Sequence, residues 1–405
     1  MKRLATTITL LALVGTAACS STTGTDPKTG GTTMTTAQDT STTERPAGCA
    51  PEQLPPGTPL GDATLRWTTG CMPFVRTPDA RFAALPDFPY EPHYAEVDGL
   101  RMAYIDEGPR DGQVVLLLHG EPTWSYLYRH MIPILSRAGY RVIAPDMIGM
   151  GRSDKPVQIA DYTYLQHVAW ISGFIDTMDL HDITAFVQDW GSLIGLRVIG
   201  DHPDRFARVV VGNGRLPVLP AGFKPIVLPD PVIPNDEWTL PFRDDAPTIP
   251  VEHFPLIAPR FAQWVVFALA GTRLRASEVV DRLAQRDLSP AELAAYDAPF
   301  PSRIHMTGVR VFPSLIDTIG DEPTNEGARQ VFNGWTKPLL TLFGRKDPNL
   351  GTDAIQAEMR DTVPGAQGQP HHAYEDAGHF VQEDVGPDLA DRIIAFIRAN
   401  PLPQS

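Results

Sequence analysis

The segment FVQDWGSL, residues 186–193, decides how this chain folds, because a short apolar run ends there on an acidic residue and a helical pattern follows at once. Gly191 and Ser192 are small enough to let the new helix pack close to the preceding strand. In one large group of hydrolytic enzymes, a sharp turn from strand to helix exposes a nucleophile, which is usually serine. Asp189 occupies that position here, so the segment predicts a carboxylate nucleophile.

Two other interpretations of this turn exist. Ser192 would need glycine two residues before and after it to complete a GxSxG pattern, but Trp190 and Ile194 occupy those positions. Asp189 could instead be a helix N-cap, which is a common role for aspartate at such a junction. Residues further along the chain decide between a nucleophile and a cap.

A hydrolytic nucleophile of this kind needs an acid and a histidine, which follow it in that order along the chain. Asp347 lies in GRKDP directly after an apolar run at 339–343, and His379 lies in DAGHF after the next strand-like run. Open parallel sheets place their sites at the carboxyl ends of strands. We therefore expect Asp189, Asp347 and His379 to form one triad, with Asp347 orienting His379.

From about residue 73 onward the pattern changes to alternating strands and helices, which predicts an α/β fold with a mostly parallel central sheet flanked by helices. Asp98-Gly99 predicts a hairpin turn between the first two strands. The expected strands are 93–97, 101–105, 114–118, 141–144, 183–187, 208–211, 339–343 and 372–375, and the expected helices are 125–137, 162–178, 192–201, 352–360 and 389–399.

Residues 217–333 interrupt this alternation with Pro-rich stretches and helical patterns at 261–269, 276–286 and 290–296. We interpret them as a helical cap inserted after the sixth strand, which divides the core into 73–216 and 334–405. This is the plan of the α/β-hydrolase fold. The cap entrance at 218–252 is long and Pro-rich, so it is expected to change access for the substrate.

The first 48 residues are not expected to belong to the fold. Lys2 and Arg3 precede an apolar run of about 14 residues that is too short to span a bilayer. Residues 1–19 therefore predict a lipoprotein-type signal peptide with lipidation at Cys19, and plain cleavage or an unprocessed cytosolic terminus are the alternatives. The Ser/Thr-rich residues 20–48 predict a solvated tether to an exported, membrane-anchored enzyme.

The two remaining cysteines, Cys49 and Cys71, form an even pair in the expected extension at 49–72. Export to an oxidising compartment predicts a disulfide between them, and two unrelated thiols are the alternative. Neither cysteine lies in a CxxC motif, so no metal or redox site is expected.

The composition excludes some functions. The 405 residues carry 34 Lys and Arg against 48 Asp and Glu, a formal net charge of −14, so nothing in the overall charge favours binding to nucleic acid. With 42% hydrophobic and 20% charged residues, the chain is typical of a globular protein.

Three motifs together resemble the haloalkane dehalogenases: HGEPTW at 119–124, VQDWG at 187–191 and GHFVQE at 378–383. The likeness covers roughly residues 73–397 and is to the subfamily that holds the halide with two tryptophans. It implies an α/β-hydrolase fold, a small hydrophobic halogenated substrate, water and a halide ion as partners, and no cofactor. His119 is expected to hold its loop.

The resemblance implies a reaction in two steps. Asp189 attacks an sp³ carbon, which gives an alkyl ester and a free halide. His379, oriented by Asp347, then takes a proton from water, and the ester is hydrolysed to an alcohol. The backbone N–H groups of Glu121 and Trp190 are the implied oxyanion hole.

The halide leaves as an anion inside an apolar pocket, so neutral N–H donors such as indole must replace its water. Trp190, next to the nucleophile, is expected to be the first donor. Trp238 and Trp264 compete for the second role, and Trp264 is preferred because its segment RFAQW is similar to the family's cap. The pocket residues implied by the resemblance are Phe261, Phe312, Pro313 and Leu350.

Two rival functions remain at this level. Epoxide hydrolases share the fold and the aspartate nucleophile, but they typically use two cap tyrosines, and Tyr296 is the only tyrosine in 217–333. A non-catalytic, surface-anchored binding protein would not need the complete triad. Halide release from a bromoalkane would separate all three functions.

Overall fold

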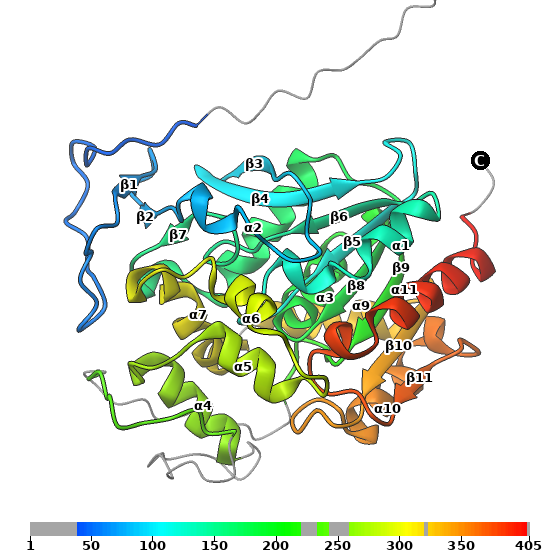
Figure 1. Ribbon diagram of the computed structural model, residues 1–405. Coiled ribbons are helices and arrows are strands. Elements are labelled where there is room, and N and C mark those ends of the chain that lie inside the picture. Colours follow the sequence, from blue (N-terminus) through cyan, green and yellow to red (C-terminus); the bar gives the residue numbers. More distant parts are fainter. Residues whose placement is uncertain (1–38, 220–232, 243–258, 320–322, 403–405) are drawn as a thin grey trace, which may run out of the picture. The chain divides into compact units, whose positions relative to one another are not determined.

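The computed structural model describes residues 39–219, 233–242, 259–319 and 323–402. Its main element is an eight-stranded sheet in the order β11-β10-β9-β8-β5-β6-β4-β3 (Figure 1). The pairs β3–β4 and β4–β6 are antiparallel, and the other five pairs are parallel. The strands are β3 (His93–Val97), β4 (Leu100–Glu107), β5 (Val114–Leu118), β6 (Arg141–Pro145), β8 (Ile183–Gln188), β9 (Phe206–Gly212), β10 (Leu339–Gly344) and β11 (His372–Tyr374).

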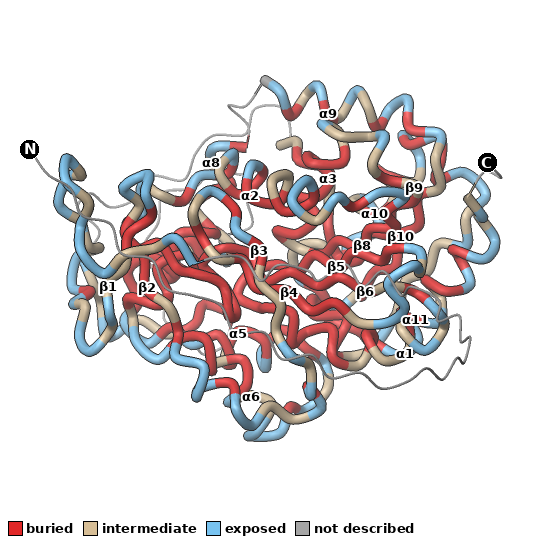
Figure 2. Tube along the Cα trace, turned by 90° about the horizontal axis from the view of Figure 1, so that it is seen from above, coloured by how far each residue is buried: buried red, intermediate tan, exposed pale blue. Residues whose placement is uncertain are grey.

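Helices cover both faces of this sheet, as the continuous apolar runs predicted. Every residue of β5, β8 and β10 is buried, because parallel strands in such folds are packed from both sides. Figure 2 shows the buried strands between two helical layers. One layer contains α1 (Ile132–Arg137) and α11 (Val381–Ala399), and the other contains α2 (Tyr164–Thr177), α3 (Trp190–Asp201) and α9 (Pro323–Asn333); α10 (Asp353–Thr362) packs beside β10.

The α/β-hydrolase plan is confirmed, and so is the hairpin between β3 and β4. Asp98 and Gly99 both take positive φ angles, 54° and 75°, as a tight turn of this hand requires. The expected helix at 125–137 is wrong in one respect, since a 3-10 helix, η2 (Ser125–Tyr128), is separated from α1. Pro133 lies in the first turn of α1, where its missing N–H and its ring prevent one continuous helix.

The cap follows β9, the sixth strand of the main sheet. It contains α4 (Pro259–Ala270), α5 (Ala276–Leu283), α6 (Pro290–Asp297), η5 (Arg303–Met306), α7 (Thr307–Val311), η6 (Phe312–Leu315) and α8 (Ile316–Ile319). The expected boundary at 333 differs from the structure, because α9 packs on α3 of the core. Gly200 permits this contact, since a Cβ there would lie 2.7 Å from the Cβ of Ala328.

The N-terminal extension is part of the folded domain. β1 (Leu65–Trp67) pairs with β2 (Pro73–Val75), and β2 pairs with β7 (Lys155–Pro156), so these strands form a small second sheet. The main sheet begins at β3, where the first strand was expected. A disulfide joins Cys49 and Cys71. The last part of the tether expected over 20–48 is not a free linker. Asp39 accepts a 2.8 Å bond from Arg76, and Thr42 forms a β-bridge with Trp67.

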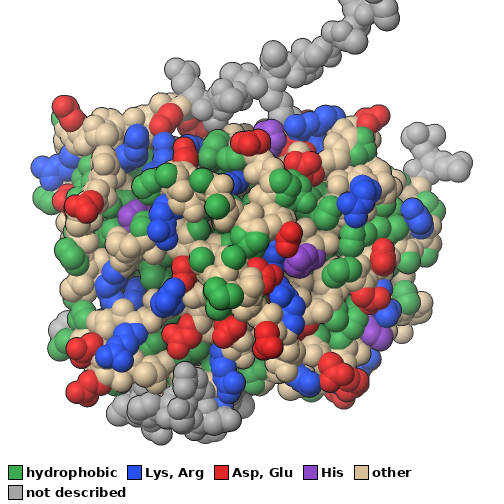
Figure 3. Space-filling model, in the orientation of Figure 1, with side chains coloured by type: hydrophobic (Ala, Val, Ile, Leu, Met, Phe, Trp, Pro, Cys, Tyr) green, Lys and Arg blue, Asp and Glu red, His purple; other side chains and the backbone are tan. Residues whose placement is uncertain are grey.

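The remaining short 3-10 helices are η1 (Asp79–Phe82), η3 (Ile159–Asp161), η4 (Pro203–Arg205) and η7 (Pro364–Ala366). The expected signal peptide, Cys19 and most of the tether lie outside the described residues. Within the described part of the chain, none of the helices has the length and apolar character needed to cross a bilayer. Acidic and basic side chains are intermixed on the face shown in Figure 3.

Candidate active site

Asp189 lies at the turn between β8 and α3 in a strained conformation, with φ 51° and ψ −129°. It occupies the N-cap position of α3, but its side chain makes no capping hydrogen bond. Oδ1 instead accepts a 2.9 Å bond from the backbone N–H of Glu121. Backbone strain of this kind costs on the order of 1–3 kcal/mol and is concentrated at functional sites, so the geometry favours a chemical role over a cap.

Two glycines make room for this turn. A Cβ at Gly120 would lie 2.2 Å from Oδ1 of Asp189, and a Cβ at Gly191 would lie 2.2 Å from the carbonyl oxygen of Leu118. Both distances are far below van der Waals contact. Gly120 therefore lets the loop after β5 approach the Asp189 carboxylate, and Gly191 lets the start of α3 approach the end of β5.

The structure brings the three predicted triad residues together. His379 Nδ1 lies 2.8 Å from Oδ2 of Asp347, and His379 Nε2 lies 3.4 Å from Oδ2 of Asp189. The other oxygen of Asp347 accepts backbone bonds from Asn349 at 2.8 Å and Leu350 at 3.0 Å. The histidine ring is thus held at one nitrogen by a buried, fixed carboxylate and faces Asp189 with the other.

The carboxylates control the charge of His379. Burial alone would lower the pKa of His379, but the charge of Asp347, together with hydrogen bonds and the charge of Asp189, more than offsets burial and raises it to about 10. Burial likewise opposes ionisation of Asp347, yet the nearby His379 keeps the pKa of Asp347 below its usual value. With both carboxylates ionised, the arrangement favours a protonated imidazole between them.

Sequence reasoning missed two residues that support this geometry. Asn213, directly after β9, donates to Oδ2 of Asp347 at 2.9 Å, and its carbonyl accepts the Asp189 N–H at 3.0 Å. Gln188 donates to the carbonyl of His379 at 3.1 Å. Both stand at the carboxyl ends of adjacent parallel strands, so strand position was the signal that could have identified them.

The HGEP loop is held by His119, as expected. Its Nδ1 lies 2.9 Å from the Gly120 carbonyl, and its Nε2 accepts the backbone N–H of Met147 at 3.0 Å. Burial lowers the pKa of His119, which favours this neutral form. The side chain of Glu121 is buried too, and burial, followed by the charge of Asp189, raises its pKa well above the usual value.

The two expected halide donors are both buried. The ring of Trp190 lies 5.2 Å from the ring of Phe312 on η6. Trp264 on α4 packs against Phe242 at 5.5 Å, and α4 itself packs against η6. Trp238, the competing residue, is only half-buried. The helix that carries Trp264 thus contacts the helix whose phenylalanine contacts Trp190.

The other expected pocket residues lie on α4, on η6 and in the loop after β10. Pro313 is buried beside Phe312, and Phe261 is half-buried one turn before Trp264. The backbone N–H of Leu350 donates to Asp347. The contact of each of these side chains with a substrate stays a prediction.

Two residues that are hydrogen-bonded to the triad also line a cavity of about 590 Å³. Its lining residue Asn349 donates its backbone N–H to Asp347, and its lining residue Leu283 accepts the backbone N–H of His379 at 3.0 Å. The cavity is lined by Phe242, Arg260, Arg282, Leu283, Gln285, Lys346, Pro348 and Asn349.

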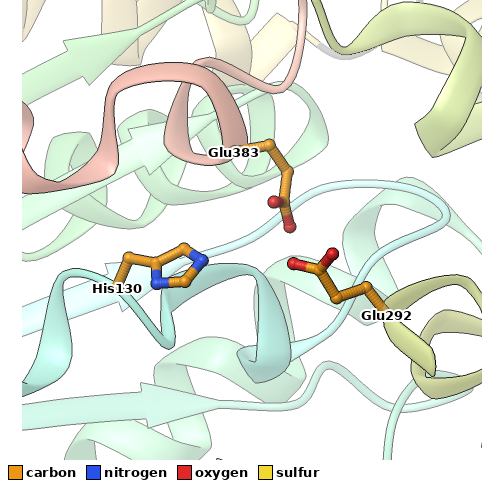
Figure 4. Close-up of side chains that lie close together, drawn as sticks. All are labelled: His130, Glu292 and Glu383. Atoms are coloured by element: carbon orange, nitrogen blue, oxygen red, sulfur yellow. The ribbon is translucent and has the colours of Figure 1, made fainter. Parts of the chain in front are cut away.

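A second cluster contains possible metal-binding side chains. His130, Glu292 and Glu383 point toward one another, with possible ligand atoms within 4.8 Å (Figure 4). However, Arg129 donates to Glu383 at 2.6 and 2.8 Å and to Glu292 at 2.8 Å, and Arg286 donates to Glu292 at 2.6 Å. Two guanidinium groups already compensate both carboxylates, which favours an ion-pair network over a metal site.

Comparison with known proteins agrees with this geometry. A family model described as "alpha/beta hydrolase fold" matches residues 113–384. The haloalkane dehalogenase of Mycobacterium marinum is 46% identical over 333 residues, which cover 80% of this chain and all of that protein. That of Psychrobacter cryohalolentis is 43% identical over 343 residues, covering 82% and all of the two chains.

Solved structures give the same result. The structure described as tetrameric haloalkane dehalogenase DpaA from Paraglaciecola agarilytica NO2 matches with a TM-score of 0.65 and 34% identity, covering 79% of this chain and 97% of that one. The order of the sheet, the strained turn at Asp189 between β8 and α3, and these similarities all indicate the same family. The chain therefore belongs to the haloalkane dehalogenase family of α/β hydrolases and is a hydrolase that cleaves carbon–halogen bonds of haloalkanes.

Proposed function

We propose that Asp189 displaces the halide to form an alkyl ester, and that His379, oriented by Asp347, activates the water that hydrolyses it. The observation that carries this proposal is the position of the Asp189 carboxylate. One oxygen is bonded by the Glu121 N–H at 2.9 Å, and the other lies 3.4 Å from Nε2 of His379. The Glu121 N–H, with the Trp190 N–H as its proposed partner, would stabilise the oxyanion that forms on the ester carbonyl.

Charge explains how one histidine serves this sequence of steps. In the free enzyme the raised pKa of His379 favours the imidazolium, which is not a base. Ester formation turns Asp189 into a neutral group and so removes two of the causes that raise the pKa of His379. The histidine then becomes easier to deprotonate, and it can accept a proton from water in the second step.

We further propose that Trp190 and Trp264 hold the leaving halide, which places the chain in the two-tryptophan subfamily. Both rings are buried, so an anion beside them would have lost its water and would need the indole N–H groups. Trp264 is favoured over Trp238 because its helix packs against η6, where Phe312 contacts Trp190.

The epoxide alternative lacks support in the cap. The hydroxyl of Tyr296 donates to the carboxylate of Glu383 and is fully buried. It is therefore engaged in the ion-pair network and is not available to protonate an epoxide oxygen.

We also propose that the enzyme is exported and anchored by lipid at Cys19. The support is the sequence pattern of Lys2, Arg3, the apolar run and Cys19, together with the Cys49–Cys71 disulfide. Disulfides persist in oxidising compartments and are rare in the cytosol, so the bond agrees with export.

Replacement of His379 by Phe should trap the proposed ester. Alkylation does not need a base, whereas hydrolysis does, so a bromoalkane should leave a stable mass increase on Asp189, detected by mass spectrometry of peptides. His181→Gln, on an exposed histidine paired with Asp179, is the control and should turn over normally. An adduct on another residue, or no adduct, would refute the assignment of Asp189.

Replacement of Asp189 by Asn should lower the pKa of His379 below about 10. The amide keeps the size of the side chain but removes the charge that stabilises the imidazolium, while Asp347 remains. A titration of the histidine ring protons by NMR measures the change. By the same reasoning, hydrolysis of the ester in the native enzyme should accelerate with rising pH until His379 is neutral. An unchanged or higher pKa in Asp189→Asn would contradict this account.

Replacement of Trp190 or Trp264 by Phe should weaken halide binding at least about tenfold, because each change removes an N–H donor and keeps an aromatic ring. Quenching of tryptophan fluorescence by bromide measures the affinity. Trp335→Phe, in the core beside Phe332, is the matched control. If Trp238→Phe weakens binding and Trp264→Phe does not, the choice of cap donor is wrong.

Replacement of Cys19 by Ser should move the protein from the membrane fraction to the soluble or unprocessed fraction, because the acyl chains that hold a lipoprotein would be absent. Fractionation and thiol labelling measure this, and Cys49 and Cys71 should stay oxidised in exported protein. A Cys49→Ser, Cys71→Ser double variant is the control and should remain at the membrane. Native protein found in the cytosol with three free thiols would overturn the proposal of export.

A further inference from the structure

A cap segment and the loop that carries His379 are joined by one carboxylate, that of Asp384. Its Oδ1 accepts the backbone N–H of Gln285 at 2.7 Å and that of Arg286 at 3.1 Å. Its Oδ2 accepts the backbone N–H of Gly378 at 2.7 Å. Asp384 thus binds the residue directly before His379 and two cap residues that lie almost one hundred positions earlier in the chain.

The two segments also touch directly. The backbone N–H of His379 donates to the carbonyl of Leu283 at 3.0 Å. A Cβ at Gly378 would lie 2.2 Å from the same carbonyl oxygen, so this approach requires glycine. The backbone of His379 is therefore fixed from the cap side, while Asp347 fixes its ring from the core side.

The neighbouring residue, Glu383, reinforces this connection. Its carboxylate contacts Arg286 from the cap, Arg129 from the core and the hydroxyl of Tyr296 on α6. This ion-pair network, which includes Glu292 and Glu383 of Figure 4, anchors the beginning of α11. The ion pairs of Glu383 thus hold the backbone next to Asp384, whose carboxylate accepts the Gly378 and Gln285 N–H groups.

We propose that Asp384 is a positioning residue that aligns His379 for hydrolysis of the ester. The inference deepens the proposed function and rests on it. Both oxygens of Asp384 accept hydrogen bonds, one from the cap amides and the other from the Gly378 amide. Asparagine has only one oxygen, so its NH₂ group would face N–H donors on one of these two sides. Asp384 does not contact Asp189, whose position depends on the β8–α3 turn and on the Glu121 N–H.

This geometry predicts that the two chemical steps respond differently to loss of the carboxylate. Attack by Asp189 does not use His379, so it should be spared. Activation of water needs Nε2 of His379 within hydrogen-bond reach, and a displacement near 1 Å costs up to about a hundredfold in rate. A purely structural role would instead reduce the amount of active protein and affect both steps alike.

The test is rapid mixing of Asp384→Asn and native enzyme with excess bromoalkane. The burst of bromide reports alkylation, and alcohol formation reports hydrolysis. We expect the burst rate to stay within about twofold, hydrolysis to slow at least about tenfold, and the alkyl-enzyme to accumulate. Because that intermediate accumulates, kcat and KM should fall together, which leaves kcat/KM nearly unchanged.

Asp388→Asn is the matched control. Asp388 lies four residues later, beyond a kink in α11 at Val385. It accepts from Tyr374 at 2.7 Å and from Arg392 at 2.6 Å, and it is exposed. This variant makes the same chemical change close to Asp384 in the sequence without touching the amide of Gly378. It should show native rates for both steps.

Equal slowing of both steps, or native hydrolysis in Asp384→Asn, would overturn the inference. The His379→Phe variant separates this failure from failure of the proposed function: if that variant traps an adduct on Asp189, the proposed function stands whatever Asp384 does. If Asp384→Asn does not fold, amide hydrogen exchange in the native protein tests whether Asp384 joins the two segments. The amides of Gly378, Gln285 and Arg286 should exchange slowly and together, and exchange of Gly378 more than about tenfold faster than Gln285 would overturn the inference.

Discussion

At Asp189 the chain passes from a fully buried strand into a buried helix within one residue, and the backbone takes a positive φ angle to do so. Such a conformation is unfavourable for a side chain, and it persists because β8 and α3 are both held by the surrounding core. The turn directs the carboxylate away from the helix and toward the end of β5, where the Glu121 N–H meets it. Gly120 and Gly191 leave the necessary space.

The charges of the site follow from this placement. A buried carboxylate next to a second one would be costly, but an imidazolium between Asp189 and Asp347 compensates both. Backbone N–H groups and Asn213 hold Asp347 in place, so the ring has one orientation. In the proposed mechanism, the same balance changes when Asp189 becomes an ester. The proposed arrangement then favours the cation in the resting enzyme and the base in the intermediate.

The cap has a second role besides covering the pocket. Its segment around Leu283 and Gln285 bonds to the loop of His379, and Glu383 and Asp384 connect the start of α11 to the same segment. Hydrogen bonds thus join the cap directly to the loop that carries His379, the proposed base. A cap that moved with substrate would carry this connection with it.

Much of this molecule could be predicted from local sequence. Most of the parallel strands appear as apolar runs because both of their faces are buried, and Asp189 and Asp347 could be predicted as triad members because each follows such a run. His379 follows the short, half-buried β11, and its place after Asp347 in the chain was the further signal. The hairpin at Asp98-Gly99 depends on two adjacent residues. These features have causes within a few positions of the chain, so the sequence by itself determined them.

Other features depend on contacts between distant segments, and only the tertiary structure decided them. The association of α9 with the core depends on Gly200 meeting Ala328, and the order of the N-terminal extension depends on Arg76, Asp39 and a strand pairing with Pro73–Val75. The connections of Asn213 to Asp347 and of Asp384 to Gly378 and Gln285 are of the same kind. The sequence around a polar side chain does not identify its hydrogen-bond partner, because the folded backbone decides which donor and acceptor come close together.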